Sequence, residues 1–228
     1  MSSRGLVAIV VLAGLLIVAA LVWRHEPSRP SPGPAPAVVV EKQPVAVATH
    51  EFDPAAPPSN LPQLAPGESA VCVSDFLSTA SVRGDSLASD ATHATSTISH
   101  IRMTLQLKID IWLPAGATPH LAEHEEGHRQ ISEYYYQTAD KVAEHIAGRY
   151  LDRRVDVTGT DLDAASRVML QQLAAEITSE YGKELNPGPT QLLFDSITDH
   201  GRNGVVATDG VAHAIKNAPV EAAGPANP

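Results

Sequence analysis

Two histidines separated by three residues offer the clearest chemistry in this sequence. They belong to the segment His124-Glu125-Glu126-Gly127-His128. Side chains four residues apart on a helix project from successive turns of one face, so the imidazoles of His124 and His128 can bind one cation together. Glu125 lies beside them around the helix and can reach a water on that cation without being a ligand. The pattern therefore predicts a Zn2+ ion held by the two histidines, with Glu125 as the general base of a hydrolytic reaction.

A catalytic zinc ion usually has three protein ligands and one water, so a third ligand is needed. The extended motif with a third histidine is excluded, because Tyr134 stands where that histidine belongs. Glu176 or Glu180, on a later predicted helix, would complete a site of two histidines and one glutamate. His200 would instead complete a site of three histidines. Spacing along the chain leaves both alternatives open.

A long alternating segment precedes the histidines. From Ile101 to Leu113 apolar residues alternate with polar ones, and a period of two residues predicts a strand. Strands usually hold about 3 to 10 residues, so a bulge or a break inside this one is expected. If the strand lies at a sheet edge beside the zinc, an extended peptide could pair with it as a further strand.

Two helices are predicted after this strand. Thr118 is a suitable N-cap and Pro119 suits the first helical position, and apolar residues follow at helical spacing until Gly148. The second helix runs from a capping Asp161 to about Leu185. The expected fold class is therefore α+β, with a short sheet packed on the histidine helix and on a second helix.

The rest of the chain divides into appendages around this domain. Residues 6–23 carry no charged side chain and are long enough to cross a membrane, so residues 1–24 are predicted to be a membrane anchor, with a cleavable signal peptide as the alternative. Residues 25–66 are rich in proline and are predicted to be a spacer. The metallohydrolase domain is expected at 67–219, and a disordered tail at 220–228.

The composition excludes some classes of function. The formal net charge is -10, which argues against nucleic acid as a partner because nucleic-acid-binding proteins normally present a basic surface. Cys72 is the single cysteine, so no intramolecular disulfide can form.

Two motifs in this order resemble a family of bacterial exported proteins regarded as zinc-dependent proteases. The family pattern joins a His-Glu-x-Gly-His helix to a later Tyr/Phe-Asp-x-x-Thr-x-His-Gly segment, which here reads Phe194-Asp195-Ser196-Ile197-Thr198-Asp199-His200-Gly201. The resemblance covers roughly Glu68 to Gly204 and implies a zincin-like fold. It also implies His200 as the third zinc ligand in preference to Glu176. Asp195 is then expected to orient a ligand imidazole through its other ring nitrogen.

The anchor and the resemblance together indicate a location and a substrate. We expect a single-pass protein of the bacterial inner membrane, with its catalytic domain in the periplasm or outside the cell. The expected reaction is hydrolysis of peptide bonds in a peptide or protein substrate, with Zn2+ as cofactor. Two other functions stay open: a non-catalytic zincin-like module that binds a partner, and a metalloamidase that acts on cell-wall peptides.

Overall fold

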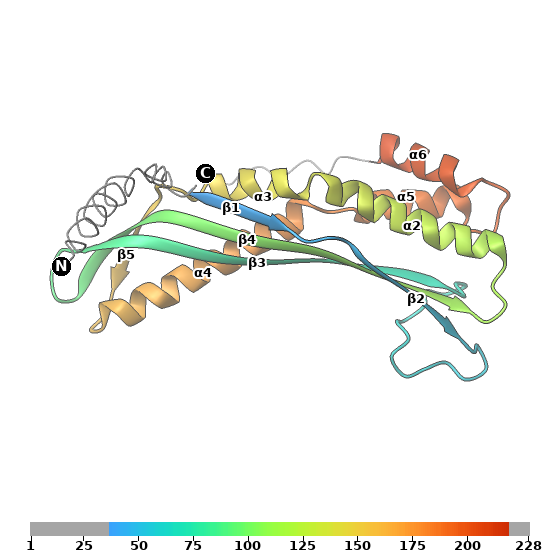
Figure 1. Cartoon of the computed structure of the whole chain (residues 1–228), viewed down its shortest axis with the longest axis horizontal. Coiled ribbons are helices and arrows are strands. Elements are labelled where there is room, and N and C mark those ends of the chain that lie inside the picture. The colour runs from blue at the N-terminus through green and yellow to red at the C-terminus, as the bar shows by residue number, and fades with distance from the viewer. Residues whose placement is uncertain (1–36, 219–228) are drawn as a thin grey trace, which may run out of the picture. The chain divides into compact units, whose positions relative to one another are not determined.

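The computed structural model describes residues 37–218, which have an α+β fold with a five-stranded mixed sheet (Figure 1). The strands are β1 (Val38–Lys42), β2 (Ala46–Phe52), β3 (Val71–Ala88), β4 (His93–Pro114) and β5 (Arg154–Thr158). The helices are α2 (Pro119–Gln137), α3 (Ala139–Gly148), α4 (Leu162–Glu184), α5 (Gly188–Thr198) and α6 (Ala207–Asn217). The predicted anchor at 1–24 and tail at 220–228 lie outside the described residues. Within residues 37–218, no helix has the length and apolarity needed to cross a membrane.

The long strand β4 is the centre of the sheet and not its edge. β3 pairs with it in antiparallel register from Ala94 to Trp112, which occupies one edge of β4 over most of its length. β5, β1 and β2 therefore share the opposite edge, where they pair in turn with residues 93–97, 101–105 and 108–114 of β4. The condition that residues 101–113 lie at a sheet edge is thus not met. Within the described part, the outer edges of the sheet belong to β3 on one side and to β1, β2 and β5 on the other.

The alternating pattern of β4 builds the core. Its inward side chains are almost completely buried, and they are Ile98, Ile101, Met103, Leu105, Leu107, Ile109 and Ile111. The irregularity expected inside residues 101–113 lies just before them, because the register opposite Arg83 and Gly84 shifts from His100 to Ile98 and leaves Ser99 as an extra residue. This bulge is needed because Ile98 and Ile101 are three residues apart yet both reach the core.

The predicted spacer contains two strands. β1 and β2 fall inside residues 25–66 and pair with β4 in parallel, so the folded part begins well before residue 67. Lys42, at the end of β1, donates to the backbone carbonyl oxygens of Tyr136 and Gln137 at 3.2 and 3.0 Å. These are the last carbonyls of α2, which have no partner within their own helix. The assignment of this segment as a spacer is therefore wrong for residues 38–52.

The helices follow the sequence prediction with one difference. Thr118 caps α2 by accepting from the backbone N–H of Leu121, and Asp161 caps α4 by accepting from that of Ala164. The single helix expected up to Gly148 is divided at Thr138 into α2 and α3. The carbonyls freed at this break are the ones that Lys42 satisfies.

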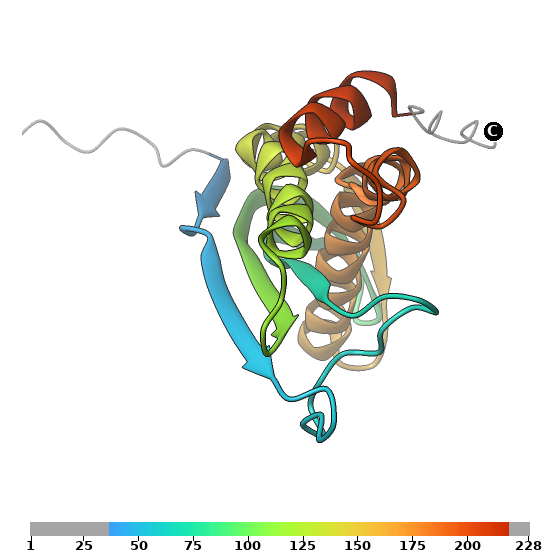
Figure 2. The same cartoon turned by 90° about the vertical axis from the view of Figure 1, so that its right-hand side faces the viewer.

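The helices lie in two layers. α2, α3 and α4 contact the strands, while α5 and α6 contact α2 and each other and, among the described elements, no strand. Figure 2 shows α6 lying over α2, in the outer layer. The motif in α2 therefore lies between the sheet and α5, where side chains from both sides can reach it.

Candidate metal centre

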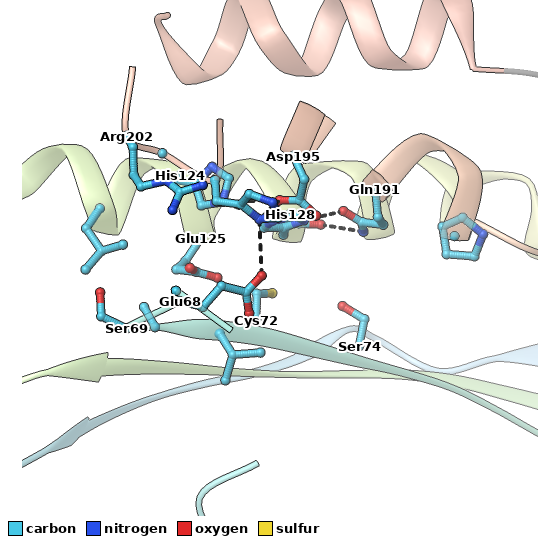
Figure 3. A pocket seen from close by; sticks show the side chains of 18 of the residues that line it. Glu68, Ser69, Cys72, Ser74, His124, Glu125, His128, Gln191, Asp195 and Arg202 are labelled. Atoms are coloured by element: carbon cyan, nitrogen blue, oxygen red, sulfur yellow. Dashed lines mark hydrogen bonds and ion pairs between the residues drawn. The ribbon is translucent and has the colours of Figure 1, made fainter. Parts of the chain in front are cut away.

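Three side chains from two helices converge at one point (Figure 3). The Nε2 atoms of His124 and His128, both on α2, lie 3.2 Å apart. Asp195 Oδ1, on α5, lies 3.4 Å from the first of these nitrogens and 3.0 Å from the second. Tetrahedral zinc with bonds of about 2.0–2.1 Å separates its ligand atoms by about 3.3 Å. The three side chains could therefore hold a metal ion without rearrangement.

The outer ring nitrogens are already hydrogen bonded, which leaves both Nε2 lone pairs available. Nδ1 of His128 is 2.6 Å from Gln191 Oε1, an acceptor, so Nδ1 carries the proton. Thr198 Oγ1 donates to a backbone carbonyl at 2.8 Å and can accept from Nδ1 of His124 at 3.3 Å. In their neutral forms the two imidazoles thus direct their Nε2 lone pairs toward one point, where a metal cation could bind.

Asp195 completes the cluster with a negative charge. Burial by itself would raise the pKa of Asp195, but the neighbouring histidines hold it well below the usual range of a carboxyl group. Burial also opposes the charging of His128, whereas Asp195 and Gln191 raise its pKa above the ordinary value. Asp195 is ionised at neutral pH, as a carboxylate ligand must be.

The chain was compared with family models, curated proteins and solved structures. None of them matches it.

Glu125 lies beside the cluster and is almost completely buried. Its carboxylate accepts a hydrogen bond from the backbone N–H of Cys72 on β3. Burial, with the nearby charges of Asp195 and Glu68, raises the pKa of Glu125 to about 7, against a lowering effect of His128. A cation at the cluster would lower this pKa again. A carboxylate poised in this range is suited to accept and return a proton.

Two neighbours of Glu125 have other roles. Burial is the main cause that raises the pKa of the Cys72 thiol to about 12, so this thiol stays protonated and is a poor metal ligand. Glu126 accepts a hydrogen bond from Arg129 at 2.7 Å, which lowers its pKa. Within the described helix, Glu125 is thus the carboxylate that faces the cluster.

The structure places Asp195 and His200 differently from the sequence prediction. Asp195 lies among the ligand atoms, whereas His200 borders them: its Nδ1 is buried, 3.2 Å from Glu68 Oε1 and 3.7 Å from Asp195 Oδ1. The cause is a tight turn after α5, in which Asp199, His200 and Gly201 all have positive φ angles. This turn brings His200 beside the cluster and holds its imidazole against Glu68.

The alternative carboxylate ligands are not at the cluster. Glu176 is half exposed on α4, with Oε1 4.0 Å from Nη1 of Arg153. Glu180 accepts a hydrogen bond from the hydroxyl of Tyr150 at 2.9 Å. A site made of the two histidines with Glu176 or Glu180 is therefore not formed.

Three residues that complete the site were not predicted from the sequence. Gln191 and Thr198 orient the imidazoles, and Glu68 holds His200. Thr198 carried a signal, because it belongs to the second motif of the resemblance. Gln191 and Glu68 belong to no recognisable motif, since they reach the cluster only through contacts between elements distant in sequence.

The packing of Phe194 against the histidine motif requires glycine at position 127. Phe194 stacks on the His124 ring with centroids 5.0 Å apart and meets the His128 ring edge-on at the same distance. A Cβ atom on Gly127 would lie 2.4 Å from Phe194 Cζ, which is well inside van der Waals contact. The absence of a side chain at this position lets Phe194 support both ligand rings.

We expect Gly127→Ala to weaken metal binding. The added methyl group must displace Phe194, and overpacking of this kind costs about 1–3 kcal/mol, more than the roughly 0.5–1 kcal/mol by which alanine favours a helix over glycine. The rings of His124 and His128 then lose their support, so zinc affinity should fall by about tenfold or more, as when an orienting contact is lost. Calorimetric titration with zinc and a thermal melt measure both effects.

Gly148→Ala is the matched control. This glycine ends α3, and an added Cβ atom would meet nothing within 4 Å. Wild-type zinc affinity and melting temperature in Gly127→Ala would contradict the packing argument.

The cluster opens into a cavity of about 830 Å³, within the size range of ligand sites. Its walls come from five parts of the chain: the segment before β3 with the start of β3 itself, α2, the end of α4, α5, and the turn after α5. The cavity is lined by His124, Glu125, His128 and Asp195. A molecule entering it would meet the metal ligands and the buried carboxylate together.

Proposed function

We propose that this chain is a zinc-dependent peptidase, in which His124, His128 and Asp195 bind the ion and Glu125 is the general base. One observation carries the proposal: three ligand atoms at zinc-like separations stand beside a buried carboxylate in an open cavity. The resemblance of the two motifs to bacterial zinc-dependent proteases agrees with it. The predicted anchor would place such an enzyme at the inner membrane, with its catalytic domain in the periplasm or outside the cell.

Zinc is the metal that suits this donor set best for hydrolysis. Two imidazoles and one carboxylate leave a position for water in a four-coordinate site. The same donors also bind iron(II) in oxygenases, so metal analysis belongs to the test. Glu125 favours the hydrolytic reading, because a buried carboxylate beside the open position serves proton transfer from water.

The protein residues divide the reaction between them. A zinc ion, when bound, polarises a water and a substrate carbonyl. Glu125 accepts the proton of the attacking water and passes it to the leaving amine nitrogen. Gln191 and Thr198 keep the imidazoles oriented during this step.

The unpaired edge of β3 would give an extended substrate a place to bind. Cys72 directs its backbone N–H away from β4 and toward Glu125, and alternate residues of a strand present their backbone groups to the same edge. The backbone groups of Ser74 and Phe76 therefore share this edge, and both residues line the cavity. An extended peptide pairing there would pass its backbone in front of the cluster.

Removal of the metal tests the proposal. We expect one zinc per purified chain, cleavage of an unfolded protein such as casein, and loss of cleavage with 1,10-phenanthroline that added zinc reverses. A ligand present at 1,000 times its dissociation constant stabilises a fold by about 4.1 kcal/mol. For a domain of this size the metal-free chain should thus melt roughly 10 °C lower.

The alternatives predict different results. A non-catalytic module would bind zinc and gain stability without cleaving any peptide. A metalloamidase would leave casein intact and release fragments from cell-wall peptides. A chain that neither retains zinc nor changes its melting temperature on zinc addition would refute the metal site itself.

A further inference from the structure

The cavity extends past the metal cluster on both sides. Gln191 and Ser74 lie on one side of His128, and Arg202 and Ser69 lie on the other (Figure 3). On the first side Gln191 donates to Ser132, which in turn donates to Ser74. The lining there continues with Phe76, Gly182, Leu185, Asn186, Pro187 and Gly188. We call this set, with Ser74, the distal arm.

The distal arm is mainly apolar and carries no charged side chain. Its apolar side chains are those of Phe76, Leu185 and Pro187 and its polar ones those of Ser74 and Asn186, whereas the part of the cavity at the cluster carries the carboxylates of Glu68, Glu125 and Asp195. Phe76 is four residues along β3 from Cys72, or about 13 Å at the strand rise of ~3.3 Å per residue. The arm therefore has room for an extended segment of about four substrate residues beyond the general base.

One wall of the arm recedes because it lacks a side chain. Gly182 lies within α4, two residues before its end, where glycine is the least favourable residue for a helix apart from proline. A Cβ atom at Gly182 would meet nothing within 4 Å. The space in front of this glycine is thus free of protein atoms, and Gly182 itself lines the cavity.

We propose that the distal arm is a specificity subsite for a large apolar side chain of the peptide substrate, with Gly182 keeping it open. This inference rests on the proposed peptidase function and names the substrate class of that site. A leucine or phenylalanine side chain of the substrate would lie between Phe76, Leu185 and Pro187. Charged side chains would lose their hydration there without gaining a partner, so the subsite selects against them.

Gly182→Leu tests the inference on the full, zinc-loaded chain. Leucine favours a helix more than glycine, so the fold should be retained, while its side chain fills the arm. The probes are peptide hydroxamates in two sets, which carry the zinc-binding group at opposite ends of the peptide. Within each set, the two probes differ only in carrying glycine or leucine. Binding is measured by calorimetric titration, which needs no turnover.

We expect the wild-type chain to bind the leucine probe of at least one set about tenfold more tightly than the glycine probe. Gly182→Leu should reduce this preference to about twofold or less and leave the glycine probe unaffected. Gly148→Leu, at a second helical glycine with open space and outside the cavity lining, should keep the wild-type preference.

The outcomes separate the subsite from the proposed reaction. An equal affinity for both probes in the wild type, or a preference that survives in Gly182→Leu, overturns the subsite. Failure of every hydroxamate to bind overturns it as well. A preference for the leucine probe that is lost in Gly182→Leu supports the subsite, even if no peptide is hydrolysed. The absence of hydrolysis would instead overturn the proposed peptidase function.

Discussion

Glu125→Gln should retain zinc and lose hydrolysis, with kcat/KM falling by about 1,000-fold, because general base catalysis contributes about 100- to 10,000-fold. The amide has the size of the carboxylate and can still accept the hydrogen bond from the backbone N–H of Cys72. It cannot accept a proton from the attacking water. Metal content, measured on the same preparation as the rate, shows whether the loss is catalytic.

Stability distinguishes this role from a structural one. Burial raises the pKa of Glu125 to about 7, so in the metal-free chain the ionised form is disfavoured by folding. A raised carboxyl pKa means that stability is lost as the pH rises through the interval between the unfolded and folded pKa values. The neutral amide avoids this loss. At pH 8 the metal-free Glu125→Gln chain should therefore melt no lower than the metal-free wild type.

Glu126→Gln is the matched control for this prediction. Glu126 is the next residue, but it pairs with Arg129 on the other side of the helix. Its replacement should leave kcat/KM within about twofold of the wild type, as is usual for an exposed position away from the reacting atoms. Equal losses in the two variants, or activity retained in Glu125→Gln, would remove the general base from the proposal.

The parts of this fold that local sequence patterns specify were predicted. Alternation marks β4, and Thr118 with Pro119 marks the start of α2, because these signals depend on neighbours in sequence. The four-residue step between His124 and His128 fixes their common face in the same way. Helix geometry thus puts both imidazoles on one face, while Gln191, Thr198 and Phe194 set the ring orientations that bring their Nε2 atoms together.

The parts that depend on distant contacts were missed. β1 and β2 are short, lie in a proline-rich context and become strands through the edge of β4 that they share with β5. The division of the helix at Thr138 becomes intelligible only with Lys42, which satisfies the carbonyls freed there from a strand far earlier in sequence. Local pattern cannot show such pairings, since neither partner is recognisable without the other.

The sequence did not predict that Asp195 lies among the ligand atoms with His200 beside them, for a related reason. Both occur in one motif, and a motif does not say which of its polar residues faces the metal. The answer depends on the turn at residues 199–201, where three consecutive left-handed residues redirect the chain. Only Gly201 of the three is a residue type that commonly adopts this conformation.

Replacing Asp195 and His200 in turn by asparagine tests which of them is the third ligand. We expect Asp195→Asn to lower zinc affinity by more than about 100-fold, because loss of a residue that only orients a ligand typically costs about 10- to 100-fold. Asparagine keeps the shape of Asp195, and its amide can donate to the Nε2 atoms of His124 and His128, so the fold should persist. His200→Asn should lower zinc affinity by about tenfold or less. Asparagine is chosen there because it tolerates the positive φ angle that alanine would resist.

Asp199→Asn controls for the turn itself. Asp199 has a positive φ angle as well, but it is exposed and pairs with Arg202 at 2.9 Å, so its replacement should leave zinc affinity at the wild-type value. Calorimetric titration of zinc into the three metal-free variants ranks them directly. If His200→Asn lost zinc while Asp195→Asn retained it, the ligand set would be three histidines, and Asp195 would return to the orienting role that its motif suggested.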